Sequence, residues 1–405
     1  MKQDVLDALT HIPGRRRRAL FYVYDGGSGI GHLRRLARIA NALKENFSCL
    51  IVTGHDAAAQ WFVPDGCEYV RLPAWDNLIP AKAAYWGRTP FIDVPISEAV
   101  RLRSAILAGI VEGFQPDAIF VDHLPLGAHA ELASVLRSTH CRKYLVTRGV
   151  QNETEDLQSL VLGGAALEAL RAQYDRILSA IDPRVFDLTG HYNLPPDVLR
   201  KVTSVGYAAP RADPDLRQAT RSARGLSDGA IWVVASAGGG QWGEPLIEAC
   251  LASARHHPDV HFDLIMGPRS RMTASAVGTD RCVAGHIQLH GSCPQLASLH
   301  SAADLVVTTG GYNSLLEAIR GRARILCIPY RKSHRDEPFH HATLLQPYVS
   351  VQVATEPGDL AALLNQTIKD CKVGPVTDRR NELSMDGADR IAEIVMADLG
   401  AGAAP

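Results

Sequence analysis

The chain has 405 residues, of which 46% are hydrophobic, and its formal net charge is −1. This length predicts two or three domains with sizeable apolar cores, and the near-neutral charge argues against a nucleic-acid partner. No stretch approaches the roughly 20 apolar residues that span a bilayer, and the N-terminus lacks an apolar signal core. We therefore expect a cytoplasmic protein. Peripheral membrane contact is compatible with the sequence but not indicated, and the oligomeric state is left open.

A strand, a glycine-rich turn and a helix form the first predicted unit. Residues 19–24 are an apolar run of strand length, residues 25–32 read DGGSGIGH, and apolar positions recur at helical spacing from Leu33 to Lys44. Further apolar strands are predicted at 49–53, 118–121, 144–147 and 177–179. Buried strands that alternate with amphipathic helices indicate an α/β protein with a parallel sheet covered on both faces.

A second α/β series follows a pause in this pattern near residue 204. Residues 210–228 are rich in Pro, Arg, Asp and Ser, which predicts an inter-domain linker. Strands are then predicted at 231–236, 262–266, 287–290, 305–308 and 325–329, with a helix that ends near His256 after the first. We therefore predict an N-terminal domain over 1–208, a C-terminal domain over 209–385, and a helix and tail over 386–405 that packs back across the domains.

Three glycine-rich turns, at 26–31, 238–243 and 308–314, each follow a strand and precede a helix. Glycine lets backbone N–H groups approach an anion at a helix N-terminus, although each turn could also be purely structural. His32 stands where a dinucleotide fingerprint needs its third glycine, and Gly31 is not followed by the Lys-Ser/Thr of a P-loop. No nucleophile elbow is present either. These turns therefore favour an anionic ligand of another kind.

Five motifs in the C-terminal half occur in a recognisable order. They are SAGGGQ at 236–241, LHG at 289–291, TGGYNSLLEA at 309–318, IPY at 328–330 and DEPFHHA at 336–342. This half resembles the C-terminal domain of glycosyltransferase family 28, the MurG-type UDP-N-acetylglucosamine transferases. The N-terminal GGSGIGH at 26–32 resembles the glycine loop of that family, and the likeness spans roughly residues 19 to 350. The resemblance implies the GT-B fold, with two facing Rossmann-like domains and an inter-domain cleft.

Two further segments, GIGHLRR at 29–35 and DPRVFD at 182–187, resemble a branch of predicted bacterial glycosyltransferases distinct from the peptidoglycan enzyme. The wider resemblance implies donor-binding roles in the C-terminal half. Glu317 would accept both ribose hydroxyls, although a solvent-facing helix acid is the alternative. Backbone groups of His290 and Gly291 would hold a uracil, or a thymine almost equally well. The diphosphate would be held by Thr309, Gly310, Gly311, Asn313 and Ser314 and, from the other side, by Gly238, Gly239 and Gln241.

The remaining donor-side residues fit the family less closely. Arg269 would pair with a phosphate or stack near the base, with a surface arginine as the alternative. Asp336 and Glu337 lie where the family often has a Gln pair that contacts sugar hydroxyls, which leaves the sugar open. Tyr312 replaces the family's usual small residue and would narrow the pocket. His340 and His341 face different ways on a helix, so no metal site is expected.

His32 and Asp122 are the candidate acid–base residues. A neutral imidazole at the end of the first glycine loop could take a proton from an acceptor, and the resemblance places a histidine there. The alternatives are a phosphate contact and a histidine that packs locally. Asp122 and His123 follow a strand at its carboxyl edge, where ligands of α/β proteins bind. Asp122 would orient His32 or bind the acceptor, and Gly29, Gly31 and His123 would complete the acceptor-side loops.

Together these features predict inverting, metal-independent sugar transfer from a nucleotide diphosphate sugar to a small-molecule acceptor. UDP is preferred over dTDP, and the nucleotide-sugar is a co-substrate, so no cofactor is expected. A predicted aromatic loop at 73–95 favours a small soluble acceptor, as in antibiotic or other secondary metabolism, with a lipid-linked acceptor as the alternative. The alternatives are a nucleotide-sugar epimerase or hydrolase of the same fold and a noncatalytic nucleotide-sugar-binding protein.

Overall fold

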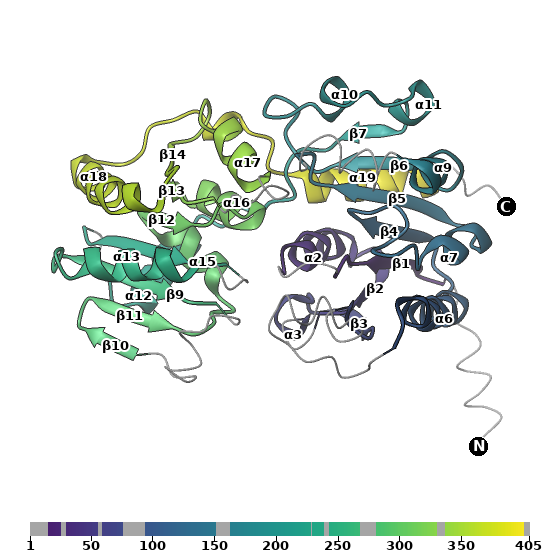
Figure 1. Ribbon diagram of the computed structural model, residues 1–405, viewed down its shortest axis with the longest axis horizontal. Helices are drawn as coiled ribbons and strands as arrows, with labels where there is room; N and C mark the ends of the chain where they lie inside the picture. The colour runs from purple at the N-terminus through teal and green to yellow at the C-terminus, as the bar shows by residue number, and fades with distance from the viewer. Residues whose placement is uncertain are drawn as a thin grey trace, which may run out of the picture.

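The part of the chain that the computed structural model describes contains two seven-stranded sheets. That part comprises residues 15–25, 30–55, 59–75, 94–150, 163–227, 229–238, 243–267, 281–329 and 337–400. The sheets lie in two lobes beside each other, and helices cover both faces of each sheet (Figure 1). The predicted fold class, α/β with two facing Rossmann-like domains, is confirmed.

The N-terminal lobe contains the sheet with strand order β3-β2-β1-β4-β5-β6-β7, in which every pairing is parallel. Its strands are β1 (Arg17–Tyr22), β2 (Phe47–Thr53), β3 (Cys67–Arg71), β4 (Ala118–Asp122), β5 (Arg142–Thr147), β6 (Arg176–Ser179) and β7 (Val202–Ser204). The strand order reverses between β1 and β4, which pair in register from Ala19↔Ala118 to Tyr22↔Val121. Such a reversal opens a crevice at the carboxyl ends of the strands.

The C-terminal lobe contains the sheet with strand order β10-β11-β9-β8-β12-β13-β14. Its strands are β8 (Ile231–Ser236), β9 (Val260–Ile265), β10 (Arg281–Ala284), β11 (Ile287–His290), β12 (Leu305–Thr308), β13 (Arg324–Cys327) and β14 (Val351–Val353). Only β10, at one edge, pairs antiparallel among the described strands. The order reverses between β8 and β12, so the second crevice lies beyond Ser236 and Thr308.

Helices connect most of these strands. In the N-terminal lobe they are α2 (Gly31–Leu43), α3 (Ala59–Phe62), α6 (Ile96–Phe114), α7 (Ala133–Ser138), α9 (Gly164–Ala172), α10 (Leu188–His191) and α11 (Pro196–Leu199). Then follow α12 (Leu216–Ala223), α13 (Glu244–Ala254), α15 (Leu296–Ala302), α16 (Tyr312–Arg320), α17 (Glu337–Leu345), α18 (Leu360–Val373) and α19 (Gly387–Gly400). Two single 3₁₀ turns are Pro357–Asp359 and Arg380–Glu382. Among the described helices, none is long and apolar enough to cross a bilayer.

The segment predicted as a linker, 210–228, contains the helix α12. Arg217 and Arg221 on this helix both bind Asp304, which directly precedes β12, and they also donate to the carbonyl of Ala302. α12 therefore packs on α15 in the C-terminal lobe. Polar composition suggested a linker because these arginines pair with partners that are distant in sequence.

The final helix, α19, lies in the N-terminal lobe although it follows the C-terminal sheet (Figure 1). Ala388, Ile391 and Val395 are buried in the same apolar cluster as Leu36 and Leu43 of α2. The chain therefore crosses between the lobes twice, once after β7 and once before α19. Burial of this helix face ties the end of the described chain to the first sheet.

Asp398→Ala is expected to lower the free energy of unfolding by about 1 kcal/mol, because it removes the polar anchor of α19. The carboxylate accepts hydrogen bonds from Arg176, at 2.7 and 2.6 Å, and from the Tyr144 hydroxyl at 3.1 Å. Chemical denaturation at neutral pH would measure the change. Asp389→Ala is the control, because Asp389 pairs with a largely exposed Arg211. Equal losses in both variants would contradict this role for Asp398.

Candidate functional site

The two lobes meet where α2 faces α16. Asn313, in the first turn of α16, donates through Nδ2 to the carbonyl of Gly31 at 3.0 Å, and its Oδ1 accepts from Arg38 at 2.7 Å. Gly31 begins α2, directly after the first glycine loop. The structure thus brings the predicted acceptor-side loop and the predicted diphosphate turn into direct contact.

His32 and Asp122 form a hydrogen-bonded pair at this boundary. His32 Nδ1 lies 2.6 Å from Asp122 Oδ2, with the imidazole 11% exposed and the carboxylate fully buried. The other carboxylate oxygen accepts from Arg35, one turn after His32 on α2. Because a carboxylate can only accept, a neutral His32 carries its proton on Nδ1, and Nε2 keeps the free lone pair.

The surroundings keep this pair in the state that a proton acceptor needs. Burial lowers the pKa of His32 to about 4, although the neighbouring Asp122 acts in the opposite direction. Burial alone would raise the pKa of Asp122, but Arg35 and His32 together hold that pKa well below its ordinary value. At neutral pH the imidazole is therefore uncharged and the carboxylate ionised.

His123 lies beside this pair with an unusual backbone. Its φ is 68°, in the left-handed region that residues other than glycine rarely adopt. Its ring centroid is 5.2 Å from that of His32 and 5.3 Å from that of Tyr24. Burial, followed by the charge of Arg148, lowers the pKa of His123 well below its ordinary value. Its Nδ1 is buried and has no hydrogen-bond partner among the described residues.

Glu317 is fully buried at the boundary and is bound by side chains from both lobes. Its Oε1 accepts from Arg34 and, at 2.6 Å, from Arg38, both on α2. Its Oε2 lies 3.2 Å from Nδ1 of His300 on α15. Burial alone would raise the pKa of Glu317, but Arg34, His300 and Arg38 lower it to about 2. Glu317, the residue predicted to bind the ribose, is therefore ionised, and arginines of the N-terminal lobe neutralise its charge.

Tyr312, which stands where the resembled family has a small residue, contacts the N-terminal lobe. Its hydroxyl donates to the carbonyl of Ala180 at the end of β6, and its ring stacks on His341 with centroids 5.6 Å apart. His341 in turn lies 3.0 Å from the hydroxyl of Tyr207. Each of these three rings is buried. Tyr312 is large because it fills space between the lobes, and His341 is occupied by this packing.

Glu337, predicted to contact the sugar, begins α17 and pairs with Arg148, which follows β5 in the N-terminal lobe. Glu337 is 7% exposed. Arg148 Nε is buried and has no hydrogen-bond partner among the described residues. A further ion pair, in addition to those of Arg34 and Arg38 with Glu317, thus crosses the boundary between the lobes near Tyr312 and His341.

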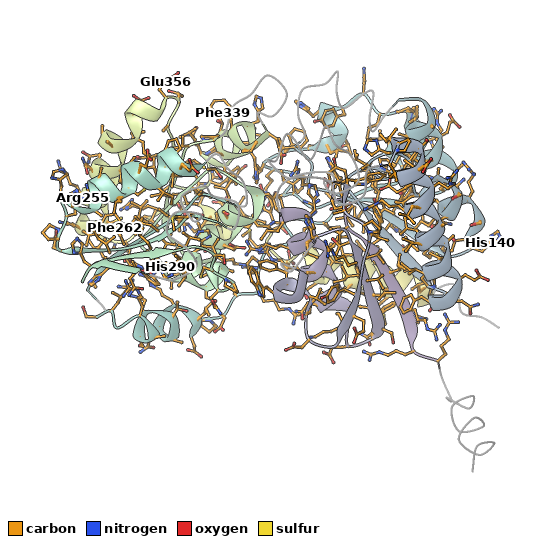
Figure 2. All side chains as sticks on the ribbon, turned by 60° about the horizontal axis from the view of Figure 1, so that its bottom comes forward. His140, Arg255, Phe262, His290, Phe339 and Glu356 are labelled. Carbon is orange, nitrogen blue, oxygen red and sulfur yellow. The ribbon has the colours of Figure 1, made fainter. Side chains whose placement is uncertain are left out.

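His290, predicted near the base, ends β11, and its side chain is fixed inside the C-terminal lobe (Figure 2). Its Nε2 lies 2.6 Å from Oδ1 of Asp263 on β9. Asp263 also accepts from Trp232 Nε1 at 2.7 Å and from Arg224 Nε at 2.9 Å. Gly291 follows directly. With the imidazole fixed in this way, a base contact from this segment would come from the backbone.

Gly238, which opens one predicted diphosphate turn of the C-terminal lobe, lies against Thr309 of the other. Gly238 has φ 74°, and a Cβ on it would lie 3.3 Å from Thr309 Oγ1. Gly310 has φ 81°, and a Cβ there would lie 3.1 Å from Cys327 Sγ. Gly311 is the N-cap of α16, and Ser314 lies in its first turn. Both turns need glycine for backbone reasons alone, whatever ligand they bind.

Five predicted site residues, and most of the predicted aromatic loop, lie outside the described part of the chain. These residues are Gly29, Gly239, Gln241, Arg269 and Asp336.

Four arginines at the boundary were not among the predicted site residues. Arg34, Arg35 and Arg38 lie on α2, and Arg148 follows β5. Positions 34 and 38 are one helical turn apart, so they face the same side, and that spacing could have drawn attention to them. Their partners could not be found in this way, because Glu317 lies 283 residues after Arg34.

A buried ion pair supports the strand end that leads into the first glycine loop. Arg103 of α6 is fully buried and donates to both carboxylate oxygens of Asp25, at 2.8 and 2.9 Å. It also donates to the carbonyl of Pro73 at 2.6 Å. One arginine thereby positions the chain after β1 and the chain after β3. Nothing in the sequence pattern of α6 indicated this role.

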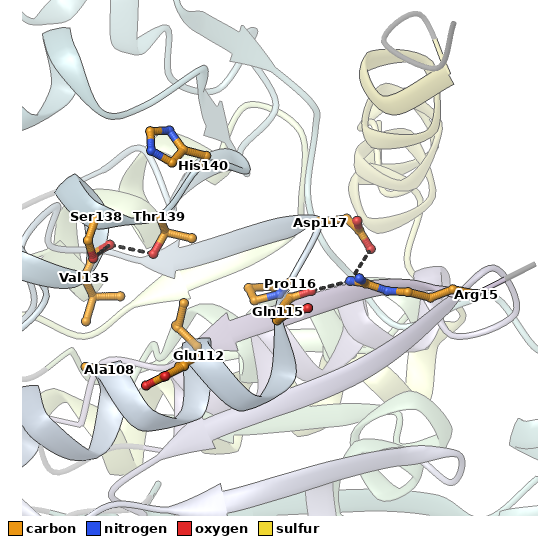
Figure 3. A pocket seen from close by; sticks show the side chains of 11 residues that line it. Arg15, Ala108, Glu112, Gln115, Pro116, Asp117, Val135, Ser138, Thr139 and His140 are labelled. Atoms are coloured by element: carbon orange, nitrogen blue, oxygen red, sulfur yellow. Dashed lines mark hydrogen bonds and ion pairs between the residues drawn. The ribbon is translucent and has the colours of Figure 1, made fainter. Parts of the chain in front are cut away.

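A cavity of about 540 Å³ lies elsewhere, at the amino ends of β4 and β5 (Figure 3). Arg15, Glu112, Asp117 and His140 are among its lining residues. This is the edge of the sheet opposite to Asp122. Because ligands of parallel α/β sheets bind beyond the carboxyl ends of the strands, we do not assign the site to this cavity.

Comparison with known proteins identifies the fold. Neither a protein-family model nor a curated protein matches the chain. Among solved structures, the glycosyltransferase of kitacinnamycin is 16% identical with a TM-score of 0.60, covering 96% of this chain and 100% of that one. UGT2 of Phytolacca americana, complexed with UDP-2-fluoro-glucose and pterostilbene, is 14% identical with a TM-score of 0.59, covering 95% and 100%.

An epimerase has a similar structure. The UDP-GlcNAc 2-epimerase from Neisseria meningitidis, bound to UDP-GlcNAc, is 12% identical with a TM-score of 0.58, covering 94% of this chain and 100% of that one. At such identities the likeness establishes architecture and not activity. The chain therefore has the GT-B fold that these glycosyltransferases and this epimerase share.

Proposed function

We propose that this protein is a glycosyltransferase that moves a sugar from a nucleotide diphosphate sugar to a small-molecule acceptor. One observation carries the proposal. His32, paired with Asp122, directly follows Gly31, whose carbonyl accepts from Asn313 at the N-terminus of α16. The candidate base and the predicted diphosphate turn therefore flank a single contact between the lobes. Displacement at a sugar carbon needs a base and a leaving-group site in such proximity.

In this proposal, Nε2 of His32 accepts the proton of the acceptor's hydroxyl or amine as that group attacks the anomeric carbon. The bond to the nucleotide diphosphate breaks on the opposite face, so the configuration is inverted. Asp122 stabilises the imidazolium that forms, and the helix dipole and N–H groups at the start of α16 stabilise the departing diphosphate. No metal takes part. UDP is the expected nucleotide and dTDP the alternative.

The first test is thermal unfolding of the protein with UDP, dTDP, GDP, ADP or NAD. A ligand at 100 times its Kd adds about 2.7 kcal/mol of stability. Stabilisation by UDP or dTDP supports the proposal. Stabilisation by NAD alone, or by none of the five, would remove its basis. Products formed from a UDP-sugar should then depend on an added acceptor, with no turnover in its absence.

An epimerase of the same fold is the second candidate, favoured by the likeness to the Neisseria enzyme. It would convert the donor without any acceptor, and a hydrolase would release free sugar. A noncatalytic binding protein would show the stabilisation but no product. Analysis of the nucleotide-sugar after incubation without acceptor separates these outcomes from transfer.

A further inference from the structure

The helix α2 presents two faces of charged side chains to the boundary between the lobes. His32 and Arg35 face Asp122, whereas Arg34 and Arg38 face Glu317 on α16. Arg38 also donates to Oδ1 of Asn313 at 2.7 Å, beside the N-terminus of α16. The helix that carries the candidate base therefore also carries a pair of guanidinium groups directed at the predicted donor residues.

This second face has more positive than negative charge. Two guanidinium groups share the single carboxylate of Glu317. Burial and the charge of Arg34 lower the pKa of Arg38 to about 10, even though Glu317 acts in the opposite direction. Two like charges held this close in a buried site favour the arrival of a further negative group.

A cavity of about 380 Å³ adjoins this face between the lobes. Four arginines (Arg34, Arg38, Arg211 and Arg320) and two aspartates (Asp386 and Asp389) are among its lining residues. Asp389 is paired with Arg211 at 2.7 Å, and Arg320 donates to the carbonyls of Pro210 and Met385. The charges lining the cavity therefore also leave an excess of arginine, which suits an anionic ligand.

Glu317 cannot accept hydrogen bonds from both ribose hydroxyls while these contacts persist. A carboxylate oxygen offers two lone pairs, and Oε1 already accepts from both arginines, while Oε2 faces His300. Both hydroxyls of a ribose could bind Glu317 only if guanidinium groups leave Oε1. Those groups would then need another anion, because a buried unpaired charge is costly.

We infer that Arg34 and Arg38 are donor-binding residues supplied by the N-terminal lobe, which exchange Glu317 for the diphosphate of a nucleoside diphosphate when the donor enters. This rests on the proposed function. Arg38 already reaches Asn313, at the helix N-terminus where the diphosphate is expected, so a small side-chain movement completes the exchange. The two phosphates supply the negative charge that the arginine pair lacks, and the donor then bridges both lobes.

Calorimetric titration of UDP and of uridine into Arg38→Gln and Arg34→Gln tests this inference. Each substitution should weaken UDP binding roughly tenfold or more, the effect of losing one charge-assisted hydrogen bond. Uridine has no phosphate, so its affinity should stay the same or rise as competition for Glu317 falls. Arg379→Gln is the matched control, because its side chain is 61% exposed, it pairs with Glu382 instead of Glu317, and it is not among the residues that line the cavity.

Arg38→Gln leaves Arg34 to neutralise Glu317, so no buried charge is stranded and the variant is expected to fold. Arg38→Lys, which keeps the charge, should bind UDP more tightly than Arg38→Gln. UDP affinity that is unchanged or increased in both glutamine variants would overturn the inference while leaving the proposed function intact. A native protein that binds neither UDP nor dTDP would instead refute the proposed function.

Discussion

Replacement of His32 by alanine is expected to lower kcat for sugar transfer by about 10²- to 10⁴-fold, the usual contribution of a general base. Stabilisation of the protein by UDP should persist, because His32 contacts Asp122 and not the predicted nucleotide residues. Asp122→Asn should have a loss in the same range, because an amide can donate to Nδ1 and favours the wrong tautomer of the imidazole. Steady-state kinetics with saturating donor would measure both.

The matched control is His140→Ala, since His140 lines the cavity at the far edge of the same sheet (Figure 3). It should leave kcat unchanged. If His32→Ala retained native kcat, His32 would have no role as a base, and the neighbouring His123 would be the next residue to replace.

The rate should also have a characteristic dependence on pH. A base acts only when it is unprotonated, and burial lowers the pKa of His32 from 6.5 to about 4. Activity limited by His32 in the free enzyme should therefore be constant from neutral pH down through 6.5, and should fall only as the pH drops toward 4. An acid limb of kcat/KM near pH 6.5 would show that His32 titrates as an exposed histidine, contrary to its burial.

Glu317→Ala is expected to destabilise the protein by about 3–5 kcal/mol, the typical cost of removing one partner of a buried ion pair. Arg34 and Arg38 would lose their shared carboxylate inside the boundary between the lobes, and His300 would lose its contact. Denaturation of the ligand-free protein would measure this effect. Glu168→Ala is the control, because Glu168 is 69% exposed and pairs on the surface with Arg171, so its change should stay within about 0.5 kcal/mol.

The contribution of Glu317 should disappear in acid. Its pKa is lowered from 4.5 to about 2 in the folded protein, so its ionised form stabilises the fold above pH 4.5, and this stabilisation is lost as the pH falls toward 2. Native protein should therefore lose more stability than Glu317→Gln between pH 5 and pH 2. Equal losses of stability in the two proteins over this pH range would mean that the ionised carboxylate of Glu317 does not stabilise the fold.

Glu317→Ala alone is a poor test of ribose binding, because the variant is also expected to destabilise the contact between the lobes. Loss of UDP binding in that variant could follow from separation of the lobes. Glu317→Gln keeps the size of the side chain and one acceptor oxygen, so its UDP affinity, compared at matched stability, reports more directly on the ribose contact.

The interior strands could be read from the sequence because they are buried on both sides. In β1, β4, β8 and β12, most or all positions are buried, so each strand contains an uninterrupted run of apolar residues. The four strands that the sequence did not predict are β3, β7, β10 and β14, which are the edges of the two sheets. In β3, Glu68, Tyr69 and Arg71 are exposed and the other two residues are only partly buried, so the apolar signal is too weak.

The sequence by itself determined the α/β alternation, the glycine turns after the strands, and the residue types suited to proton transfer and to an anion. These depend on local pattern and on chemistry. Only the tertiary structure decided that His32 meets Asp122 at 2.6 Å and that Arg34 and Arg38 bind Glu317. Those contacts join residues 90 and more than 270 positions apart. They arise from strand order and from the docking of α2 on α16, which no local pattern encodes.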